Sequence, residues 1–295
     1  MERAVALVLQ VKERNSTIVV YGDYDVDGTC GAVLLAKYFR HHLGLRTLIH
    51  QPHRLQQGYG VHDDDLRLLA VAAGDRPMLV TVDCGISAVN EVALAKELGF
   101  TVLITDHHEP GKILPAADAI LNPKQGECGF PDKDIAGVGV AFFFLMALRT
   151  TMLKSGFFKD KLMPNLKNEL ELVALGTVAD VVPLRGVNRI LVKGGLEMLA
   201  RQPRVGVTAL RHKAGMDHGP IGGRDIAFRL APRLNAASRM GQVELARDLL
   251  DSDDPEQARH IAGQLEAVNS ERQEVTAKIL EEALAQSRQQ SVDPQ

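Results

Sequence analysis

Short apolar runs alternate with amphipathic segments in the first half of the chain. Four runs are rich in apolar and β-branched residues and are bounded by Gly, Pro or Asp: 17–21, 46–50, 78–82 and 101–105. Three longer segments between them carry apolar residues at helical spacing: 29–43, 63–73 and 88–98. The runs are typical of buried strands and the longer segments of helices. This alternation predicts an α/β fold with a doubly wound, mainly parallel sheet and helices on both of its faces.

Helical patterns dominate from residue 135 onward, where strand-like runs become scarce. The apolar spacing predicts helices over 136–153, 165–178, 189–200 and 225–230, and a long final helix over 255–288. The mixed charges of the final helix fit a solvated helix that caps the domain as well as a connector to a further domain. We expect three parts: an α/β domain at 1–185, a helical subdomain completing the core at 186–252, and a connector helix with a polar tail at 253–295.

Composition narrows the class of protein. Lys and Arg number 34 against 37 Asp and Glu in 295 residues, so a nucleic-acid partner would be held by local basic residues or by metal ions. Cys30, Cys84 and Cys128 are widely spaced, which argues against a disulfide framework and a structural zinc site. We expect no apolar run to span a bilayer, and the first ten residues lack the basic start of a secretory signal. A reducing cytoplasm without membrane contact is the predicted location.

Acidic residues and two histidines follow three of the four predicted strands, and a further acidic residue ends an apolar helix. In chain order they are Asp23, Asp25, Asp27, Asp83, Asp106, His107, His108 and Asp180. Ligands of α/β sheets bind beyond the carboxyl ends of the strands, so we expect these side chains to converge there. Converging carboxylates repel one another and are costly to desolvate unless a cation neutralises them. The pattern therefore predicts a metal site.

The side-chain chemistry favours two divalent cations. Asp and His without Cys suit Mn²⁺ or Mg²⁺, and such a set can hold two ions about 3.5–4 Å apart, which activate a water for phosphoester hydrolysis. Taken singly, Asp27 or Asp83 is more often a helix cap than a metal ligand. An EF-hand calcium loop is disfavoured because its later Glu is absent. The conjunction of these motifs at successive strand ends favours a metal-dependent hydrolase.

Four ordered motifs resemble those of the DHH phosphoesterase superfamily. They are Asp25-x-Asp27-Gly28, Val82-Asp83-Cys84-Gly85, Thr105-Asp106-His107-His108 and the segment 176–184, and they are supported by Arg54 with Gly58-Tyr59-Gly60 and by the segments 136–142 and 233–239. The set is most similar to the RecJ-type single-stranded-DNA-specific exonucleases. This resemblance implies a 5′-to-3′ exonuclease of DNA repair and recombination that uses two Mn²⁺ or Mg²⁺ ions. It also implies single-stranded DNA as a partner, together with single-stranded-DNA-binding protein and a helicase.

The resemblance also implies roles for individual residues. The implied metal ligands are Asp25, Asp27, Asp83, His107 and Asp180, with Asp83 placed to bridge the two ions and Asp23 as a further candidate. Asp23 would compensate for Tyr21, which stands where relatives have a metal-binding His. His108 would face the scissile phosphate as a proton donor or charge stabiliser, and Asp106 would orient the imidazoles. The implied contacts to the DNA backbone are Arg54, Arg233, Asn235 and Arg239.

Several interpretations stay open at this point. The arginines could carry ordinary surface or helix-pairing charge. Gly137 and Gly139 could offer N–H groups to a phosphate or could allow close helix packing. Ser238 replaces the usual Gly of its block, and we expect the family's second domain and its oligonucleotide-binding-fold domain to be missing. The alternative functions are a DHH-type phosphodiesterase or phosphatase for short oligonucleotides or small nucleotides, and an inactive DNA-binding scaffold.

Overall fold

A parallel sheet forms the centre of the first half of the protein. The computed structural model describes residues 1–201, 203–217 and 219–290, and in this part the five strands follow the order β2-β1-β3-β4-β5. Their bounds are Ile18–Gly22 for β1, Thr47–His50 for β2, Met78–Val82 for β3, Thr101–Thr105 for β4 and Ala119–Leu121 for β5. All four pairings are parallel. The predicted α/β class and parallel sheet are confirmed.

The strand order creates a switch point between β1 and β3. The chain leaves β1 for β2 on one side and returns to β3 on the other side. The register aligns Gly22 of β1 with Val82 of β3, and Val82 with Thr105 of β4. The last residues of three neighbouring strands therefore lie at one level. Connections that diverge from adjacent strands leave a crevice at their carboxyl ends.

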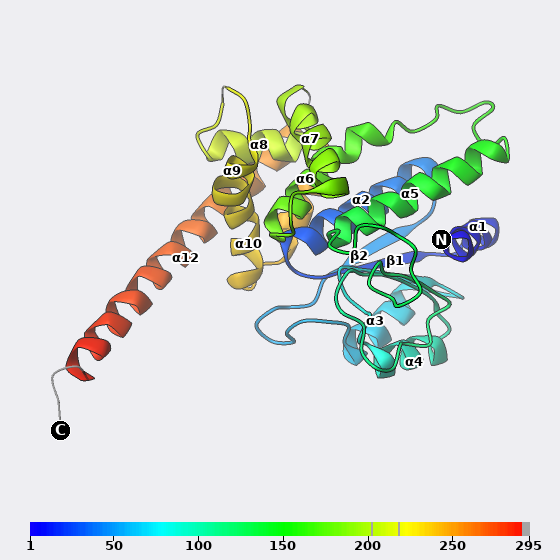
Figure 1. The fold of residues 1–295 in the computed structure, drawn as a ribbon, viewed down its shortest axis with the longest axis horizontal. Helices are drawn as coiled ribbons and strands as arrows, with labels where there is room; N and C mark the ends of the chain where they lie inside the picture. The colour runs from blue at the N-terminus through cyan, green and yellow to red at the C-terminus, as the bar shows by residue number, and fades with distance from the viewer. Residues whose placement is uncertain (202, 218, 291–295) are drawn as a thin grey trace.

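Helices cover both faces of this sheet, as a doubly wound fold requires (Figure 1). One face carries α1 (Glu2–Arg14), α2 (Val26–Leu43) and α5 (Gly137–Lys154), and the other carries α3 (Asp63–Ala73) and α4 (Val89–Glu97). Alternate strand residues supply the two cores: Val20 and Val80 belong to the first, and Val19 and Leu79 to the second. Because both faces are covered, the central strands β1 and β3 are buried at every residue and show no alternation.

The second half is helical. It contains η1 (Leu166–Glu169), α6 (Leu170–Ala179), α7 (Gly186–Arg201), α8 (Val205–Lys213), α9 (Gly223–Asp225), η2 (the π-helical turn Ile226–Leu230), α10 (Ala231–Arg239), α11 (Glu244–Asp251) and α12 (Pro255–Gln290). The start of α12 packs on α8 and α10, and its end projects away from the body (Figure 1). The boundaries at 185 and 252 stay predictions, and residues 291–295 of the predicted polar tail lie outside the described residues.

Helix α5 departs from the expectation that no apolar run could span a bilayer. By length and composition alone, Gly137–Lys154 is long and apolar enough to cross a membrane. However, 56% of this window is buried inside the protein, where α5 packs against α1, α2 and α6. A core helix between other helices must be apolar on most sides. The apolar run is therefore explained by the fold.

Candidate metal centre

The turn after β1 delivers three carboxylates to the switch point. Asp25 is the N-cap of α2, and its side chain accepts a hydrogen bond of 3.0 Å from the Gly28 N–H. Three residues thus separate the strand from the helix, and Asp27 lies in the first turn of the helix. A Cβ on Gly28 would lie 2.5 Å from the Asp23 carbonyl oxygen, so this tight turn requires glycine. The capping role considered for Asp27 belongs to Asp25.

The fully buried Asp27 carboxylate is held by the N-terminus of α5. Its two oxygens accept hydrogen bonds from the Gly137 N–H at 2.6 Å and the Val138 N–H at 3.0 Å. A Cβ on Gly137 would lie 2.8 Å from the Asp83 Cβ. Of the two interpretations of this glycine, close packing is correct, and the N–H groups at this helix end bind a carboxylate of the chain itself.

Asp83 reaches the centre through an uncommon backbone conformation. It follows β3 with a φ of 62°, in the left-handed region, which costs about 1–2 kcal/mol for a residue with a Cβ. The Asp83 N–H donates to the Thr105 carbonyl at 3.0 Å, so the strand pairing continues into this residue. The turn directs the carboxylate to His107, whose Nε2 lies 2.9 Å from Asp83 Oδ1.

His107 lies between carboxylates from three segments of the chain. Its Nε2 is 3.9 Å from Asp27 Oδ2 and 3.7 Å from Asp180 Oδ2, at the end of α6. Three overlapping groups have ligand atoms within 4.8 Å of one another: Asp83, His107 and His108; Asp27, His107 and Asp180; and Asp23, Asp25 and Asp83. The structure therefore brings together all six predicted ligands and His108. Asp83 and His107 each belong to two of these groups.

The electrostatics of this cluster favour a bound cation. Burial, together with neighbouring carboxylates, raises the pKa values of Asp23, Asp27 and Asp180 to about 7 and that of Asp83 well above its ordinary value. Buried Oδ1 of Asp23 and Oδ2 of Asp180 have no hydrogen-bond partner among the described residues. Uncompensated buried carboxylates destabilise a fold, and a divalent cation removes this cost. The residues present therefore fit Mn²⁺ or Mg²⁺.

Asp106 orients His108. Its buried carboxylate accepts hydrogen bonds from the N–H groups of Ile86, His107 and His108, and its Oδ1 lies 2.8 Å from His108 Nδ1. The hydrogen bond from Asp106 raises the pKa of His108. Burial opposes ionisation of Asp106, but its bonds to His108 lower the pKa of that carboxyl overall. The contacts of Asp106 with His107 run through the backbone, so its orienting effect is confined to the second imidazole.

A group of arginines lies beside the carboxylates. The Arg54 guanidinium lies over the Tyr24 ring, 4.7 Å from its centroid. Burial and the nearby guanidiniums of Arg54 and Arg272 lower the pKa of Arg239. In the described part of the chain no ion pair engages Arg54 or Arg239. Arg272 lies on α12 among mixed charges, and no sequence motif marked it; its proximity to Arg239 became visible only in the fold.

The other two predicted DNA contacts differ in their surroundings. Arg233 pairs with Glu266 of α12 through its Nε at 2.5 Å and its Nη2 at 3.1 Å, and it also donates to the Arg229 carbonyl. This is the helix-pairing role that the sequence left open. Asn235 has a buried Oδ1 without a hydrogen-bond partner among the described residues. Ser238 is buried inside α10, where its hydroxyl donates to the Asn235 carbonyl at 3.2 Å.

Tyr21 does not join the metal centre. Its hydroxyl donates to Asp65 Oδ2 at 2.8 Å, on α3, and lies 3.3 Å from the Gly60 carbonyl oxygen. Burial, with the nearby Asp65 charge, raises the pKa of this phenol. At the position where relatives are expected to have a metal ligand, this chain has a residue that binds the loop after β2.

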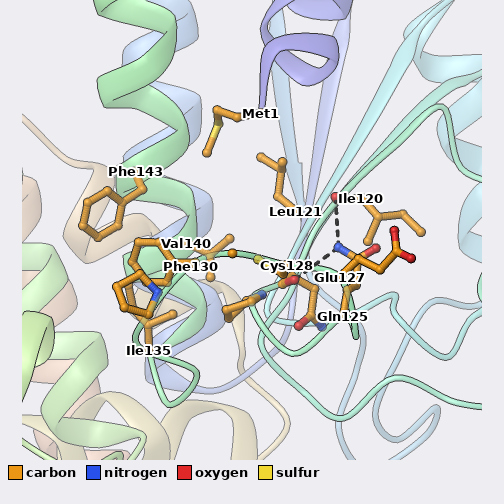
Figure 2. Close-up of a pocket in the computed structure, with 14 residues that line it drawn as sticks. Met1, Ile120, Leu121, Gln125, Glu127, Cys128, Phe130, Ile135, Val140 and Phe143 are labelled. Atoms are coloured by element: carbon orange, nitrogen blue, oxygen red, sulfur yellow. Dashed lines mark hydrogen bonds between the residues drawn. The ribbon is translucent and has the colours of Figure 1, made fainter.

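An apolar cavity of about 610 Å³ lies between α5, β5 and the loop that follows β5 (Figure 2). The side chains around it include Leu121, Phe130, Ile135, Val140 and Phe143. The Gln125 amide at its wall donates to the carbonyls of Ile120 and Asn122, which closes the loop on itself. No converging set of carboxylates and imidazoles faces this cavity in the described ranges, so the reactive groups gather at the metal centre instead.

Comparison with known proteins gives a consistent result. The model of the DHH family, N-terminal domain, matches residues 17–177. A protein of Dickeya dadantii named single-stranded-DNA-specific exonuclease RecJ is 41% identical over 96% of this chain and 49% of its own length. The chain thus spans about half the length of the curated relatives it matches.

Two crystal structures resemble the fold over 96% of the chain. One is exonuclease RecJ bound to manganese, with a TM-score of 0.84 and 36% identity over 69% of that chain. The other is RecJ from Thermus thermophilus in complex with Mn²⁺, with a TM-score of 0.80 and 34% identity over 39% of that chain. The family model matches more than half of the sequence, and the metal centre lies at the strand ends that its motifs follow. This chain belongs to the DHH family and is a homologue of the RecJ exonucleases.

Proposed function

We propose that this chain is the catalytic core of a metal-dependent, single-stranded-DNA-specific 5′-to-3′ exonuclease of DNA repair and recombination. The convergence of five carboxylates and two imidazoles at the switch point carries the proposal, because the cluster needs cations and has the composition of a phosphoesterase centre. The name of the Dickeya dadantii relative supports the substrate class. Single-stranded DNA is the proposed substrate, and single-stranded-DNA-binding protein and a helicase are proposed partners in the cytoplasm.

Asp25, Asp27, Asp83, His107 and Asp180, with Asp23, are the proposed ligands of two Mn²⁺ or Mg²⁺ ions. Crystal structures of RecJ relatives contain Mn²⁺ or Mg²⁺, which supports this choice. When bound, two such ions supply an activated water and offset charge on the phosphoryl oxygens. The oxygen-rich ligand set suits hard cations better than it suits structural zinc.

Side chains of this protein are proposed to donate a proton to the leaving group and to bind the DNA phosphates. Asp106 binds His108 at Nδ1, which leaves Nε2 on the other edge of the ring. The His108 side chain is 44% exposed, and with a hydrogen on both ring nitrogens it can donate the Nε2 proton to the 3′ oxygen that leaves on hydrolysis. Arg54 and Arg239 lie beside the carboxylates without an ion pair among the described residues, and a guanidinium is suited to backbone phosphates.

A second candidate function is hydrolysis of short oligonucleotides or small nucleotides. Among the described residues, the guanidiniums beside the centre without an ion pair are few, namely Arg54, Arg239 and Arg272, which favours a substrate with few phosphates. The scaffold alternative is disfavoured, since such proteins lose metal ligands and here the expected acidic and imidazole groups are present and close together.

The decisive experiment measures release of mononucleotides from 5′-phosphorylated single-stranded DNA in Mn²⁺, with EDTA, duplex DNA and Asp83→Ala controls. Metal-dependent release that is specific for single strands and lost in the variant supports the proposal. Cleavage of a dinucleotide without attack on longer DNA would favour the second candidate. No cleavage of either substrate, with no Mn²⁺-dependent rise in melting temperature, would leave the scaffold alternative.

A further inference from the structure

The Tyr59 hydroxyl contacts two parts of the metal centre at once. It donates to the Asp83 carbonyl oxygen at 3.2 Å and lies 3.1 Å from His108 Nδ1. The two rings meet edge to face, with centroids 5.4 Å apart. Tyr59 comes from the loop between β2 and α3, so it joins a third segment of the chain to the residues that follow β3 and β4.

The hydrogen-bond partners of His108 determine which of its ring nitrogens carries the hydrogen. A phenol has one hydrogen, and the carbonyl of Asp83 can only accept, so the Tyr59 oxygen accepts from the imidazole. Asp106 Oδ1, 2.8 Å from the same Nδ1, is also an acceptor. Both contacts therefore require Nδ1 to carry the hydrogen, and Nε2 is the atom that faces away from them. The Tyr59 hydroxyl also donates to the carbonyl of Asp83, whose backbone lies in the left-handed region.

The loop that carries Tyr59 is anchored by a buried carboxylate. Asp65 accepts from the Tyr21 hydroxyl at 2.8 Å and from Gln57 Nε2 at 2.9 Å. Gly58 and Gly60, on either side of Tyr59, have φ values of 81° and 105°, which residues with a Cβ rarely adopt. The loop therefore has one fixed end at Asp65, and its backbone path presents Tyr59 to the metal centre.

We infer that Tyr59 is a positioning residue for the reaction: its hydroxyl holds His108 in the Nδ1–H tautomer and supports the left-handed turn at Asp83. The inference rests on the proposed function, in which His108, with a hydrogen on both ring nitrogens, donates the Nε2 proton to the leaving oxygen and is left as the Nδ1–H tautomer. Without the hydroxyl, Asp106 still binds the imidazole, but the ring loses its second contact and the Asp83 carbonyl loses its donor. Removal of the Tyr59 hydroxyl is expected to slow the chemical step without weakening DNA binding, because the phenyl ring of Tyr59→Phe keeps the apolar contacts of the tyrosine ring.

The test compares Tyr59→Phe with the unaltered protein on two substrates in Mn²⁺. On a 5′-phosphorylated dinucleotide, kcat is expected to fall about 10- to 100-fold with KM unchanged, the usual cost of losing a group that orients a catalytic one. On the p-nitrophenyl ester of thymidine 5′-monophosphate the loss is expected to be smaller, because nitrophenolate leaves without a proton. Tyr38→Phe is the matched control, since its buried hydroxyl lies far along α2 and has no hydrogen-bond partner in the described part of the chain.

A second readout does not need activity. Long-range ¹⁵N–¹H spectra of the histidine rings report which nitrogen carries the proton, and Tyr59→Phe is expected to convert a fixed Nδ1–H signal of His108 into a tautomer mixture. An unchanged kcat and an unchanged tautomer in Tyr59→Phe would overturn the inference, as would a loss of Mn²⁺-dependent stabilisation equal to the loss in kcat. An unaltered protein that cleaves neither substrate, but shows the tautomer change in Tyr59→Phe, would overturn the proposed function and support the positioning role.

Discussion

At the scale of single residues, this protein places its acidic groups where they oppose folding unless a cation binds. Asp27 and Asp83 are almost completely buried, and this burial, together with the neighbouring carboxylates, raises the pKa of each. Hydrogen bonds compensate Asp27 in part, through two N–H groups of α5. Asp83 has His107 as its near partner. A site with this cost is expected to serve chemistry and not stability.

Removal of either central ligand is expected to abolish hydrolysis while the fold stays intact. Asp83→Ala deletes the group shared by two candidate clusters, and His107→Ala deletes the imidazole between three carboxylates. Asp83→Ala also relieves crowded charge, and His107→Ala costs Asp83 one hydrogen-bonding partner without adding charge, so neither metal-free variant is expected to unfold. Nucleotide release, circular dichroism and the Mn²⁺-dependent melting temperature check this prediction. Full activity in both variants would contradict it.

At the scale of elements, the arrangement of α10 against α12 separates two arginines of one motif. Arg233 is paired with Glu266, whereas Arg239 has no ion pair among the described residues and lies near the charges of Arg54 and Arg272, which lower its pKa after burial. We expect Arg233→Ala to lower the free energy of unfolding by about 1 kcal/mol, as for a partly exposed ion pair. We expect Arg239→Ala to leave stability nearly unchanged and to raise KM for DNA about tenfold, through loss of a charged hydrogen bond.

Denaturant unfolding and steady-state kinetics on the two variants separate these effects. Arg233→Lys is the matched control, because it keeps the charge opposite Glu266 and loses the two-pronged geometry. If Arg233→Ala weakened DNA binding and Arg239→Ala weakened the fold, the assignment of the two roles would be reversed.

The contact of α5 with the metal centre is a second element-scale feature. Gly137→Ala would place a Cβ 2.8 Å from the Asp83 Cβ and 3.0 Å from its Cα, so α5 would have to move away from Asp27. We expect Mn²⁺ affinity to fall about tenfold or more, because this helix end orients a metal ligand. Gly126→Ala is the control, since its Cβ would meet no atom within 4 Å. Calorimetric titration with Mn²⁺ measures the difference, and equal affinities would refute the role of α5.

Sequence patterns predicted the elements that have strong local signals. Strands β3 and β4 begin and end where the apolar runs do, and the acidic groups could be placed because each follows a strand. Strand β5 was not predicted because three residues are too short to show a pattern. Next to this strand, the Asp118 side chain accepts a hydrogen bond from the Val102 N–H of β4. The short helices α8, α10 and α11, which pack against α12, were also missed.

Contacts between residues far apart in the sequence could not be predicted from the sequence alone. Tyr59 lies 49 positions before His108, and its block was recognised without a role for the hydroxyl. The bonds of Asp27 to α5 join residues about 110 positions apart. Such partners are set by strand order and by helix crossing, which apolar periodicity does not encode. The sequence therefore suggested the candidate ligands and the orienting role of Asp106, but not the contacts of Tyr59 or of the α5 N–H groups.

At the scale of the whole molecule, folding and metal binding are linked through protons. Asp23, Asp27 and Asp180 have pKa values of about 7 in the metal-free fold, raised by burial and by neighbouring carboxylates. Their ordinary value is 3.8, so below pH 7 the folded protein holds protons that the unfolded chain has released. The free energy of unfolding then falls as pH rises towards and through 7, because the folded state must lose protons that it binds more tightly.

The metal-free protein is therefore expected to melt at a lower temperature at pH 8 than at pH 6.5. In this window the raised pKa of His108 acts in the same direction. The lowered pKa of His107 has little effect, because that ring is neutral in both states above its ordinary value of 6.5. Mn²⁺ should reverse the trend, since it binds the deprotonated carboxylates and stabilises the folded state more at pH 8.

Thermal melts in EDTA and in Mn²⁺ at both pH values measure this linkage. Asp180→Asn is the matched variant, because it keeps the size of a group with an unpartnered oxygen and removes one of the three titrations near pH 7. Its metal-free melting temperature should depend less on pH, and its gain from Mn²⁺ should be smaller. A metal-free protein that becomes more stable from pH 6.5 to pH 8 would mean that these carboxylates are already ionised and compensated within the fold, and the cluster would then have no need of a cation.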